Sequence, residues 1–419
     1  MLKLFINKNF KAILLTSLLF LIYYRSPYIF LNGRFIAEEG SFWFRNAFLF
    51  GPIEGLTQVF IGSAYFNLWA NLSSVVASVL PLEYAPLGTV YMALIVQLYL
   101  YNFIIFSESN FFVNKTDRIL LSLIVLIAPP MVASVWLNTL VSQVYFTIIT
   151  ILIFFQKDIT NSFFNKSSPI IIFFSGFSSV LPCVLSPFFV LKYLKDKSRF
   201  NLMNLIAISV PTIFQLIIFL YAKITGLEKL LADGPRYILS FTKIVSYFYN
   251  VIVKSFLGRD LTQFIFDKLF NEKSFLLVIV LITILILFFL KISFTKIKQD
   301  KIILYLILFF ILQSFLVIYV AKFEGVQGRY AVVPGILLIF ICYRLFQISS
   351  GFLRIITFSL ILLSLTSGIY EYKFNNIYPE LLSCIDCPEW KSEVTKWKND
   401  NTYILKIWAY PQRSMDLKY

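Results

Sequence analysis

Histidine is absent from the 419 residues of the chain, and charged residues are scarce at 14%. The lack of histidine excludes Ser-His-Asp and Cys-His nucleophile systems, histidine metal sites and histidine proton shuttles. A soluble domain carries roughly 25% charged residues, so this chain lacks the charge to cover a water-exposed surface. Any acid–base chemistry must come from carboxylates, tyrosine, lysine or cysteine.

Hydrophobic residues make up 59% of the chain and aromatic residues 18%, and the mean hydropathy is +0.79. This composition predicts an all-α polytopic membrane protein whose first partner is the lipid bilayer. The formal net charge of +15 comes from lysines and arginines in short clusters between apolar runs. Such clusters are typical of cytoplasmic loops, so we expect no nucleic acid as a partner.

Apolar runs suited to a spanning helix of about 20 residues recur along the chain. They lie near 12–30, 87–106, 119–136, 139–156, 202–222, 274–294, 302–320, 332–349 and 353–370. A further apolar stretch, 169–194, is interrupted by Ser175-Gly176, Pro182 and Ser186-Pro187. It predicts a hairpin of two short or broken helices. Together the runs predict about eleven transmembrane helices.

The segment 62–80 decides the topology, because its asparagines and serines make it a weak span. If this segment lies on the membrane surface without crossing, the basic turns all fall on the side of the N-terminus, as the positive-inside rule favours. We therefore expect a cytoplasmic N-terminus and a C-terminus outside. The outer loops are then 31–86 and 223–273, within a transmembrane domain over 1–370, and 371–419 forms an outer tail subdomain.

Two adjacent glutamates, Glu38 and Glu39, follow the first apolar run, with Arg34 and Arg45 on either side. Ionisable groups held against a bilayer are costly and often functional. Neighbouring residues of a helix differ in direction by about 100°, so we expect only one of the two to point into a cavity. The alternative is that both are solvated and stabilise the N-terminus of a helix over 41–50.

The form Ala-Glu-Glu-Gly before an aromatic-rich juxtamembrane segment resembles the GT-C glycosyltransferase superfamily. Other parts of the chain carry the same resemblance: Tyr65-Phe66-Asn67-Leu68-Trp69, Trp136-Leu137-Asn138, Gly328-Arg329-Tyr330, Cys384-Ile385-Asp386-Cys387 and Ile407-Trp408-Ala409-Tyr410-Pro411. The family motif commonly contains aspartate, whereas both acids here are glutamates. The resemblance implies a GT-C-like bundle in a bacterial inner membrane. It also implies transfer of a sugar from a polyprenyl-phosphate carrier to a cell-surface glycan such as O-antigen, on the outer face.

This chemistry needs no histidine. In direct displacement a carboxylate takes the proton of the acceptor hydroxyl while that oxygen attacks the anomeric carbon. Polyprenyl phosphate is already a good leaving group, and a single displacement implies inversion. Glu39, next to Gly40, is our first choice of base, and Glu38 is the second.

The phosphate of the carrier needs positive charge, for which arginine is suited by its fork of donors. The candidates to bind phosphate or sugar are Arg329, Tyr330, Arg236, Arg259, Arg34, Arg45, Trp136, Asn138 and Asn67. Each has an ordinary alternative role as an interfacial anchor, a solvated loop charge or a helix–helix contact.

Of the four cysteines, Cys183 and Cys342 fall in apolar runs and are expected to be small buried side chains. Cys384 and Cys387 form a lone C-x-x-C in the outer tail, which favours a disulfide over a zinc or redox centre. We assign no cofactor and no metal-ligating residues. A divalent metal ion stays an open alternative, because some GT-C enzymes use one, although two glutamates alone do not make a site.

After Pro388, the residues Trp390, Val394 and Trp397 recur at the spacing of one helix face. They predict a short helix that packs on the rest of the protein.

Two other functions compete with glycosyl transfer. An O-antigen polymerase is also polytopic and uses arginines of two outer loops, but it lacks an early acidic pair. A flippase or transporter of lipid-linked sugars should place charges near the middle of its spans. Here the apolar runs are almost free of charge, which favours chemistry at the outer surface.

Overall fold

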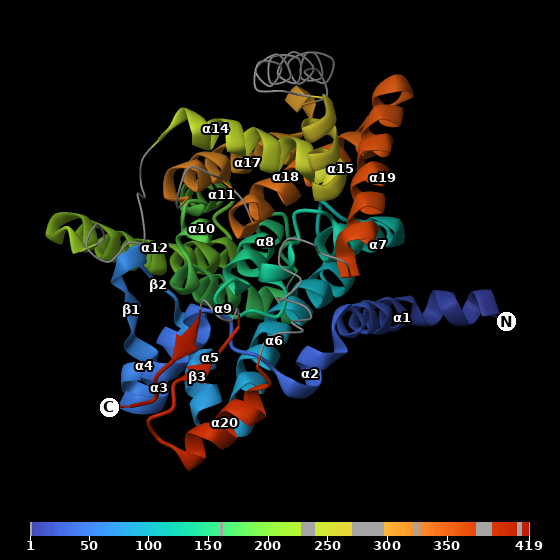
Figure 1. Ribbon diagram of the computed structural model, residues 1–419. Helices are drawn as coiled ribbons and strands as arrows, with labels where there is room; N and C mark the ends of the chain where they lie inside the picture. The colour runs from blue at the N-terminus through green and yellow to red at the C-terminus, as the bar shows by residue number, and fades with distance from the viewer. Residues whose placement is uncertain are drawn as a thin grey trace. The chain divides into compact units, whose positions relative to one another are not determined.

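The computed structural model describes residues 2–159, 162–227, 239–269, 297–321, 326, 328–373, 388–408 and 413–418. Over these residues the protein is mostly helical, with two small antiparallel two-stranded sheets (Figure 1). The chain forms two compact units. The first comprises Met1–Ser109, Ala133–Ala232 and Asn375–Tyr419, and the second comprises Asn110–Val132 and Asp233–Phe374.

The first unit contains most of the helices and both sheets. Its elements are α1 (Leu2–Arg25), α2 (Pro27–Asn32), η1 (Glu39–Phe44), α3 (Arg45–Phe50), α4 (Pro52–Thr57), β1 (Val59–Phe60), η2 (Ile61–Ser63), β2 (Tyr65–Phe66), α5 (Leu68–Ser78), η3 (Leu82–Tyr84), α6 (Ala85–Phe106), η4 (Ala133–Val135), α8 (Ser142–Phe154), α9 (Phe163–Ser178), α10 (Val180–Cys183), α11 (Ser186–Lys195), α12 (Arg199–Thr225), α20 (Trp390–Asn399), β3 (Leu405–Lys406) and β4 (Ser414–Met415). The strands pair as β1 with β2 and β3 with β4.

The second unit is helical over its described residues. Its elements are α7 (Lys115–Ile127), α14 (Phe241–Tyr247), η5 (Phe248–Val253), α15 (Lys254–Leu269), α17 (Lys301–Val320), η6 (Gly328–Ala331), α18 (Val332–Ile348) and α19 (Gly351–Lys373). Gly258 interrupts α15 with φ of +70°, which only glycine adopts readily.

Five helices in the described part of the chain are long and apolar enough to cross a membrane. They are Leu82–Phe106, Arg199–Thr225, Lys301–Val320, Gly328–Ile348 and Gly351–Tyr372. Counting the bent pair Phe163–Ser178 and Val180–Lys195 as one span raises the number to six. The multi-pass membrane character is thus as expected, but the count of about eleven is not supported. The run at 274–294 lies outside the described residues.

Two expected spans, 119–136 and 139–156, contain helices that are shorter than the apolar runs that suggested them. Helix α1 has 24 residues, but it ends at Arg25, inside the run 12–30, and a new helix begins at Pro27. Helix α7 ends at Ile127, just before Pro129 and Pro130, and α8 has only 13 residues. Proline lacks the backbone N–H and disfavours helical geometry in the residue before it. Hydropathy alone therefore overestimated the length of these helices.

The apolar stretch 169–194 is broken as expected, with its two helices bent by 117° at Ser179. A side chain from α12 satisfies the backbone groups that the break frees. Gln215 Nε2 donates to the carbonyls of Gly176 and Phe177 at 3.1 and 3.3 Å. The same amide exchanges hydrogen bonds with the backbone N–H and C=O of Phe66. Gln215 therefore ties the break to β2.

The segment 62–80 contains a helix, α5, of 11 residues. At 1.5 Å per residue it is about 17 Å long, too short for a hydrocarbon core of about 30 Å. It fits a helix that does not cross. Cys183 and Cys342 are buried free thiols, as expected, whereas Cys384 and Cys387 lie outside the described residues.

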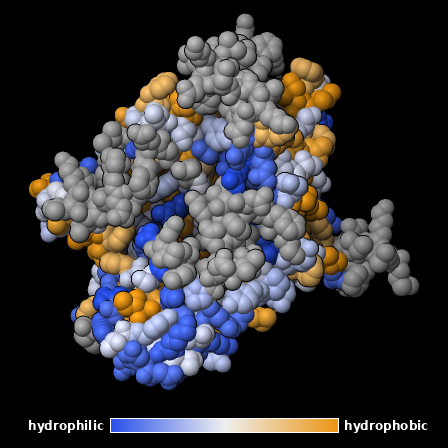
Figure 2. All heavy atoms as spheres, in the orientation of Figure 1, coloured by the Kyte–Doolittle hydropathy of each residue, from blue (hydrophilic) through white to orange (hydrophobic). Residues whose placement is uncertain are grey.

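The described part of the tail shares a hydrophobic core with residues 35–85 of the first unit. Trp390 and Val394 of α20 and Ile407 pack with Phe35 and Phe44, and Trp397 packs against the same cluster. The predicted tail helix and its apolar face are confirmed. In Figure 1 the red elements α20 and β3 lie against the blue elements of residues 31–86. Figure 2 shows mostly hydrophilic residues on the surface over α20.

Candidate functional site

The chain turns sharply between α2 and the acidic pair. Gly33 has φ of +67°, and a Cβ atom there would come within 2.9 Å of the backbone of Pro86 and Leu87. Ala37 also lies in the left-handed region, with φ of +48°. For a residue with a Cβ atom this conformation costs roughly 1–3 kcal/mol and is often found at functional sites. We call residues 33–39 the elbow.

Glu39 opens η1 and points into the protein, with only 1% of its surface exposed. Its Oε1 accepts hydrogen bonds from the backbone N–H of Thr139 at 3.1 Å and from the Thr139 hydroxyl. Its Oε2 accepts one long bond of 3.4 Å from the N–H of Ile36. Burial raises the pKa of Glu39 above its usual range, while the bonds from Thr139 and the charge of Arg34 oppose that rise.

The partner of Glu39 lies in a second strained turn, between η4 and α8. Leu137 has φ of +47°. Asn138 fixes the turn locally, because its Oδ1 accepts from Leu140 N at 3.0 Å and its Nδ2 donates to Ser134 O at 3.1 Å. The turn thereby presents Thr139 to Glu39. The amide of Asn138 is engaged by its own loop.

Arg34 is the cation beside Glu39. It is 1% exposed, and its Nη2 donates to the carbonyl of Trp136 at 3.1 Å. Its Cζ lies 5.9 Å from the ring of Trp136 and 5.7 Å from the ring of Trp408. Its Nε and Nη1 are buried and have no hydrogen-bond acceptor among the described residues. Burial lowers the pKa of Arg34 to about 10, so the guanidinium stays charged at neutral pH.

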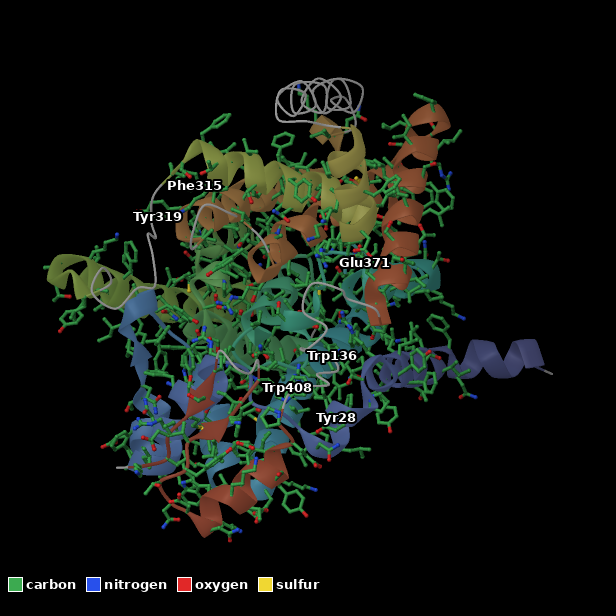
Figure 3. All side chains as sticks on the ribbon, viewed as in Figure 1. Tyr28, Trp136, Phe315, Tyr319, Glu371 and Trp408 are labelled. Atoms are coloured by element: carbon green, nitrogen blue, oxygen red, sulfur yellow. The ribbon has the colours of Figure 1, made fainter. Side chains whose placement is uncertain are left out.

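A second arginine approaches the same tryptophan. Arg25, the last residue of α1, is buried, and its Cζ lies 5.8 Å from the ring of Trp136. The indole Nε1 of Trp136 is also buried without an acceptor among the described residues. Figure 3 shows Trp136, Trp408 and Tyr28 gathered in one region. Two guanidinium groups and one carboxylate thus share a buried site. In it, donors of Arg34 and Trp136 have no acceptor among the described residues.

Glu38 points toward the tail. Its side chain is 25% exposed, and its Oε1 lies 3.4 Å from Arg413 Nη2. Arg45 also binds the tail, because its Nε donates to the carbonyl of Asp416 at 2.6 Å and its Nη2 to that of Lys418 at 3.4 Å. Neither acid makes the side-chain bond that caps a helix. Of the two glutamates, therefore, one is buried and one is at the surface.

Asn67 lies close to the Thr139 turn and has a structural role there. Its Oδ1 accepts from Ala70 N at 3.1 Å and so caps α5, while its Nδ2 donates to Leu140 O at 3.4 Å. Trp136 is 1% exposed, so protein groups surround its ring.

The other predicted phosphate ligands belong to the second unit. Arg329 and Tyr330 lie in η6, with the Arg329 Cζ 5.6 Å from the Tyr330 ring. The backbone N–H of Arg259 donates to the carboxylate of Glu371, which also accepts from Asp260 N at 3.3 Å. Glu371 thus caps the helix that restarts after Gly258. Arg236 lies outside the described residues.

Three residues of the site, Thr139, Arg25 and Trp408, were not predicted from the sequence to belong to it. Thr139 follows the Trp136-Leu137-Asn138 turn directly, and that adjacency was the only signal for it. Arg25 is a single charge inside the apolar run 12–30, and that position was the only signal for it. Trp408 was noted only as part of the tail stretch that carries the family resemblance, and its role was not expected, because its contacts join residues hundreds of positions apart. In the described part of the chain, no group of three or more cysteine or acidic side chains is arranged to hold a metal ion.

Comparison of the chain with protein-family models, with curated proteins and with solved structures finds no match. A functional assignment must therefore rest on the residues and their geometry.

Proposed function

We propose that the protein is a GT-C-like glycosyltransferase of a bacterial inner membrane, with its N-terminus in the cytoplasm and its C-terminus outside. It would move a sugar from a polyprenyl-phosphate donor to a cell-surface glycan such as O-antigen. The observation that carries the proposal is that one elbow holds a buried carboxylate, Glu39, and a buried arginine, Arg34, two of whose donors have no acceptor among the described residues. These are the two groups that the reaction requires.

Glu39 suits the role of general base. A base works best when its pKa is close to the pH of the reaction, and burial moves the pKa of Glu39 upward toward neutrality. The Thr139 bonds hold Oε1 in place, so the weakly engaged Oε2 is the oxygen that would accept the proton of the acceptor hydroxyl. Glu38 is paired with Arg413 at the surface, which makes it the weaker candidate.

Arg34 suits the phosphate. Its Nε and Nη1 lie on different edges of the guanidinium group, and each can donate to a phosphate oxygen. Buried donors that lack an acceptor among the described residues are costly, and an anionic ligand removes that cost. Arg25 lies on the same Trp136 ring, with its Cζ at 5.8 Å, so a second positive charge is close to Arg34, as a phosphate requires.

The reaction balances with these groups alone. The acceptor oxygen gives its proton to the Glu39 carboxylate and forms a bond to the anomeric carbon. The bond from that carbon to the phosphate oxygen breaks, and its electron pair leaves with the polyprenyl phosphate, stabilised by Arg34. A single displacement predicts a product with inverted anomeric configuration.

The distribution of charge argues against a transporter. The acidic and basic residues of the five apolar helices all lie near a helix end, as with Glu83, Lys223 and Arg354. Transporters place ionisable groups close to the middle of the membrane. An O-antigen polymerase would rely on arginines of two outer loops, and it would not need the buried carboxylate of Glu39.

The test is sugar transfer from lipid-linked donors by purified protein in lipid nanodiscs. Glu39→Gln should lower kcat by about 10²–10⁴-fold, the usual contribution of a general base. Glu38→Gln is the matched control, because it removes a neighbouring charge from the surface, and it should lose less than about threefold. Full activity in Glu39→Gln, or a product that keeps the donor's configuration, would refute the mechanism.

A further inference from the structure

The C-terminal tail meets the elbow through its backbone. Trp408 N donates to the carbonyl of Phe35 at 3.1 Å, and Ala37 N donates to the carbonyl of Trp408 at 2.8 Å. The two bonds attach the tail to the elbow at Phe35 and at Ala37, the residues before and after Ile36. They also fix the strained φ of Ala37, the residue whose conformation directs the following glutamates.

The side chain of the same tail residue holds the arginine. The Trp408 ring is almost completely buried and faces the Arg34 guanidinium at 5.7 Å, while Trp136 faces it at 5.9 Å. Tyr28 stacks on the Trp408 ring, with centroids 6.5 Å apart and planes inclined by 16°. Tyr28, Trp136 and Trp408 are labelled in Figure 3. The Nε and Nη1 of Arg34 have no acceptor in the part of the chain that the structure describes.

Packing and further hydrogen bonds attach the described part of the tail to the elbow. Ile407, the residue before Trp408, packs beneath the elbow, since a Cβ atom on Gly40 would lie 3.1 Å from its Cδ1. Buried Glu393 holds β3 in place by accepting from Lys406 N at 3.0 Å and from the Tyr403 hydroxyl at 2.8 Å. Glu38 and Arg45 add polar links to the end of the tail.

We infer that the tail completes the candidate site, and that Trp408 is the positioning residue that sets both the direction of the Arg34 guanidinium and the course of the elbow. The part of this inference that concerns phosphate rests on the proposed function. The part that concerns the elbow does not. Trp408 would not touch the reacting atoms, and its effect would pass through Arg34 and Ala37.

Two substitutions separate positioning from simple loss of packing. Trp408→Ala removes the ring beside Arg34. Trp397→Ala removes a ring of equal size from the same tail, where it packs on Phe48 at the side of the shared core and has no contact with Arg34 or Ala37 among the described residues. Trp408→Phe keeps an aromatic face and should restore part of the function.

The first measurement is hydrogen exchange at the Ala37 amide, which does not depend on any activity. We expect exchange about tenfold faster in Trp408→Ala and unchanged in Trp397→Ala. The second is binding of a short polyprenyl phosphate to protein in nanodiscs. The affinity should fall by about fivefold to tenfold in Trp408→Ala and by about twofold in Trp408→Phe, as expected for loss of a buried cation–π contact. It should not change in Trp397→Ala.

Equal exchange at Ala37 in the two alanine variants, or the same lipid affinity in Trp408→Ala as in the wild type, would overturn the positioning role. If the wild type binds no polyprenyl phosphate while the exchange result holds, the proposed function fails and the role of the tail at the elbow stands.

Discussion

The two units of the protein each bury charged residues beside apolar helices, but they do so in opposite ways. In the second unit Asp117 Oδ2 accepts from Val113 N and Asn114 N at 2.9 and 3.0 Å, and its Oδ1 accepts from the Tyr343 hydroxyl. Arg344 makes two bonds to Asp300, at 3.1 and 2.7 Å. Gln347 joins the two groups by donating to Tyr343 and accepting from Arg344.

The site in the first unit lacks this completeness. Among the described residues, Asp117 and Arg344 have no buried side-chain nitrogen or oxygen without a partner, whereas Arg34 has two such atoms and Trp136 has one. Fully satisfied polar networks stabilise a fold, and unsatisfied buried donors cost stability. Both sites hold charged side chains among apolar helices. What distinguishes the candidate ligand site from the structural cluster around Asp117 and Arg344 is that some of its buried donors have no acceptor among the described residues.

The largest expected effect comes from replacing Arg34 of the first unit and, for comparison, Arg344 of the second unit with glutamine. Arg34→Gln removes the Nε and Nη1 donors, which have no acceptor among the described residues, so we expect the KM for the lipid-linked donor to rise by about tenfold to a hundredfold. Loss of the Nη2 bond to the Trp136 carbonyl should lower the free energy of unfolding by about 1–2 kcal/mol. Arg344→Gln should leave that KM unchanged and lower the thermal stability. Kinetics and thermal unfolding of both variants test this, and a reversed pattern would contradict the distinction between the clusters.

A smaller effect is expected from the acid of the structural cluster. Asp117→Ala removes the cap of α7 and leaves the Tyr343 hydroxyl without its acceptor, which together should cost about 2–3 kcal/mol of unfolding free energy. The activity per folded molecule should stay the same. Chemical denaturation in detergent measures the first quantity. Tyr343→Phe is the matched control, because it removes the same bond from the other side and should cost less.

The smallest effect is on the pH dependence. Because the base must be ionised and burial raises the pKa of Glu39, kcat/KM should begin to fall at a pH clearly above 4.5 as the solution is made acidic. The protonated form of Glu39 favours folding, and this contribution is lost as pH rises through its folded-state pKa. Glu39→Gln should therefore be at least as stable as the wild type at neutral pH. An acid limb near 4.5, or a destabilised Glu39→Gln, would argue against a buried base.

Much of the architecture could be read from local patterns. The apolar helices Arg199–Thr225, Lys301–Val320 and Gly351–Tyr372 match apolar runs, and the proline-rich stretch around Pro182 predicted the break between α9 and α10. The period of Trp390, Val394 and Trp397 predicted α20. The number of spans was overestimated because hydropathy does not register where a helix ends, as at Ile127 before Pro129 and at both ends of α8. The division at residue 370 and the roles of the individual site residues stay predictions.

The sequence by itself determined the class of protein, the chemistry open to it without histidine, and the place of an acidic pair after the first helix. Only the tertiary structure decided which glutamate is buried and which arginine lies beside it. Those choices depend on Thr139 and Trp136, 100 and 102 positions along the chain from Glu39 and Arg34, and on Trp408 in the tail. Contacts over such separations leave no period or spacing in a single sequence, because they arise only when distant turns pack together.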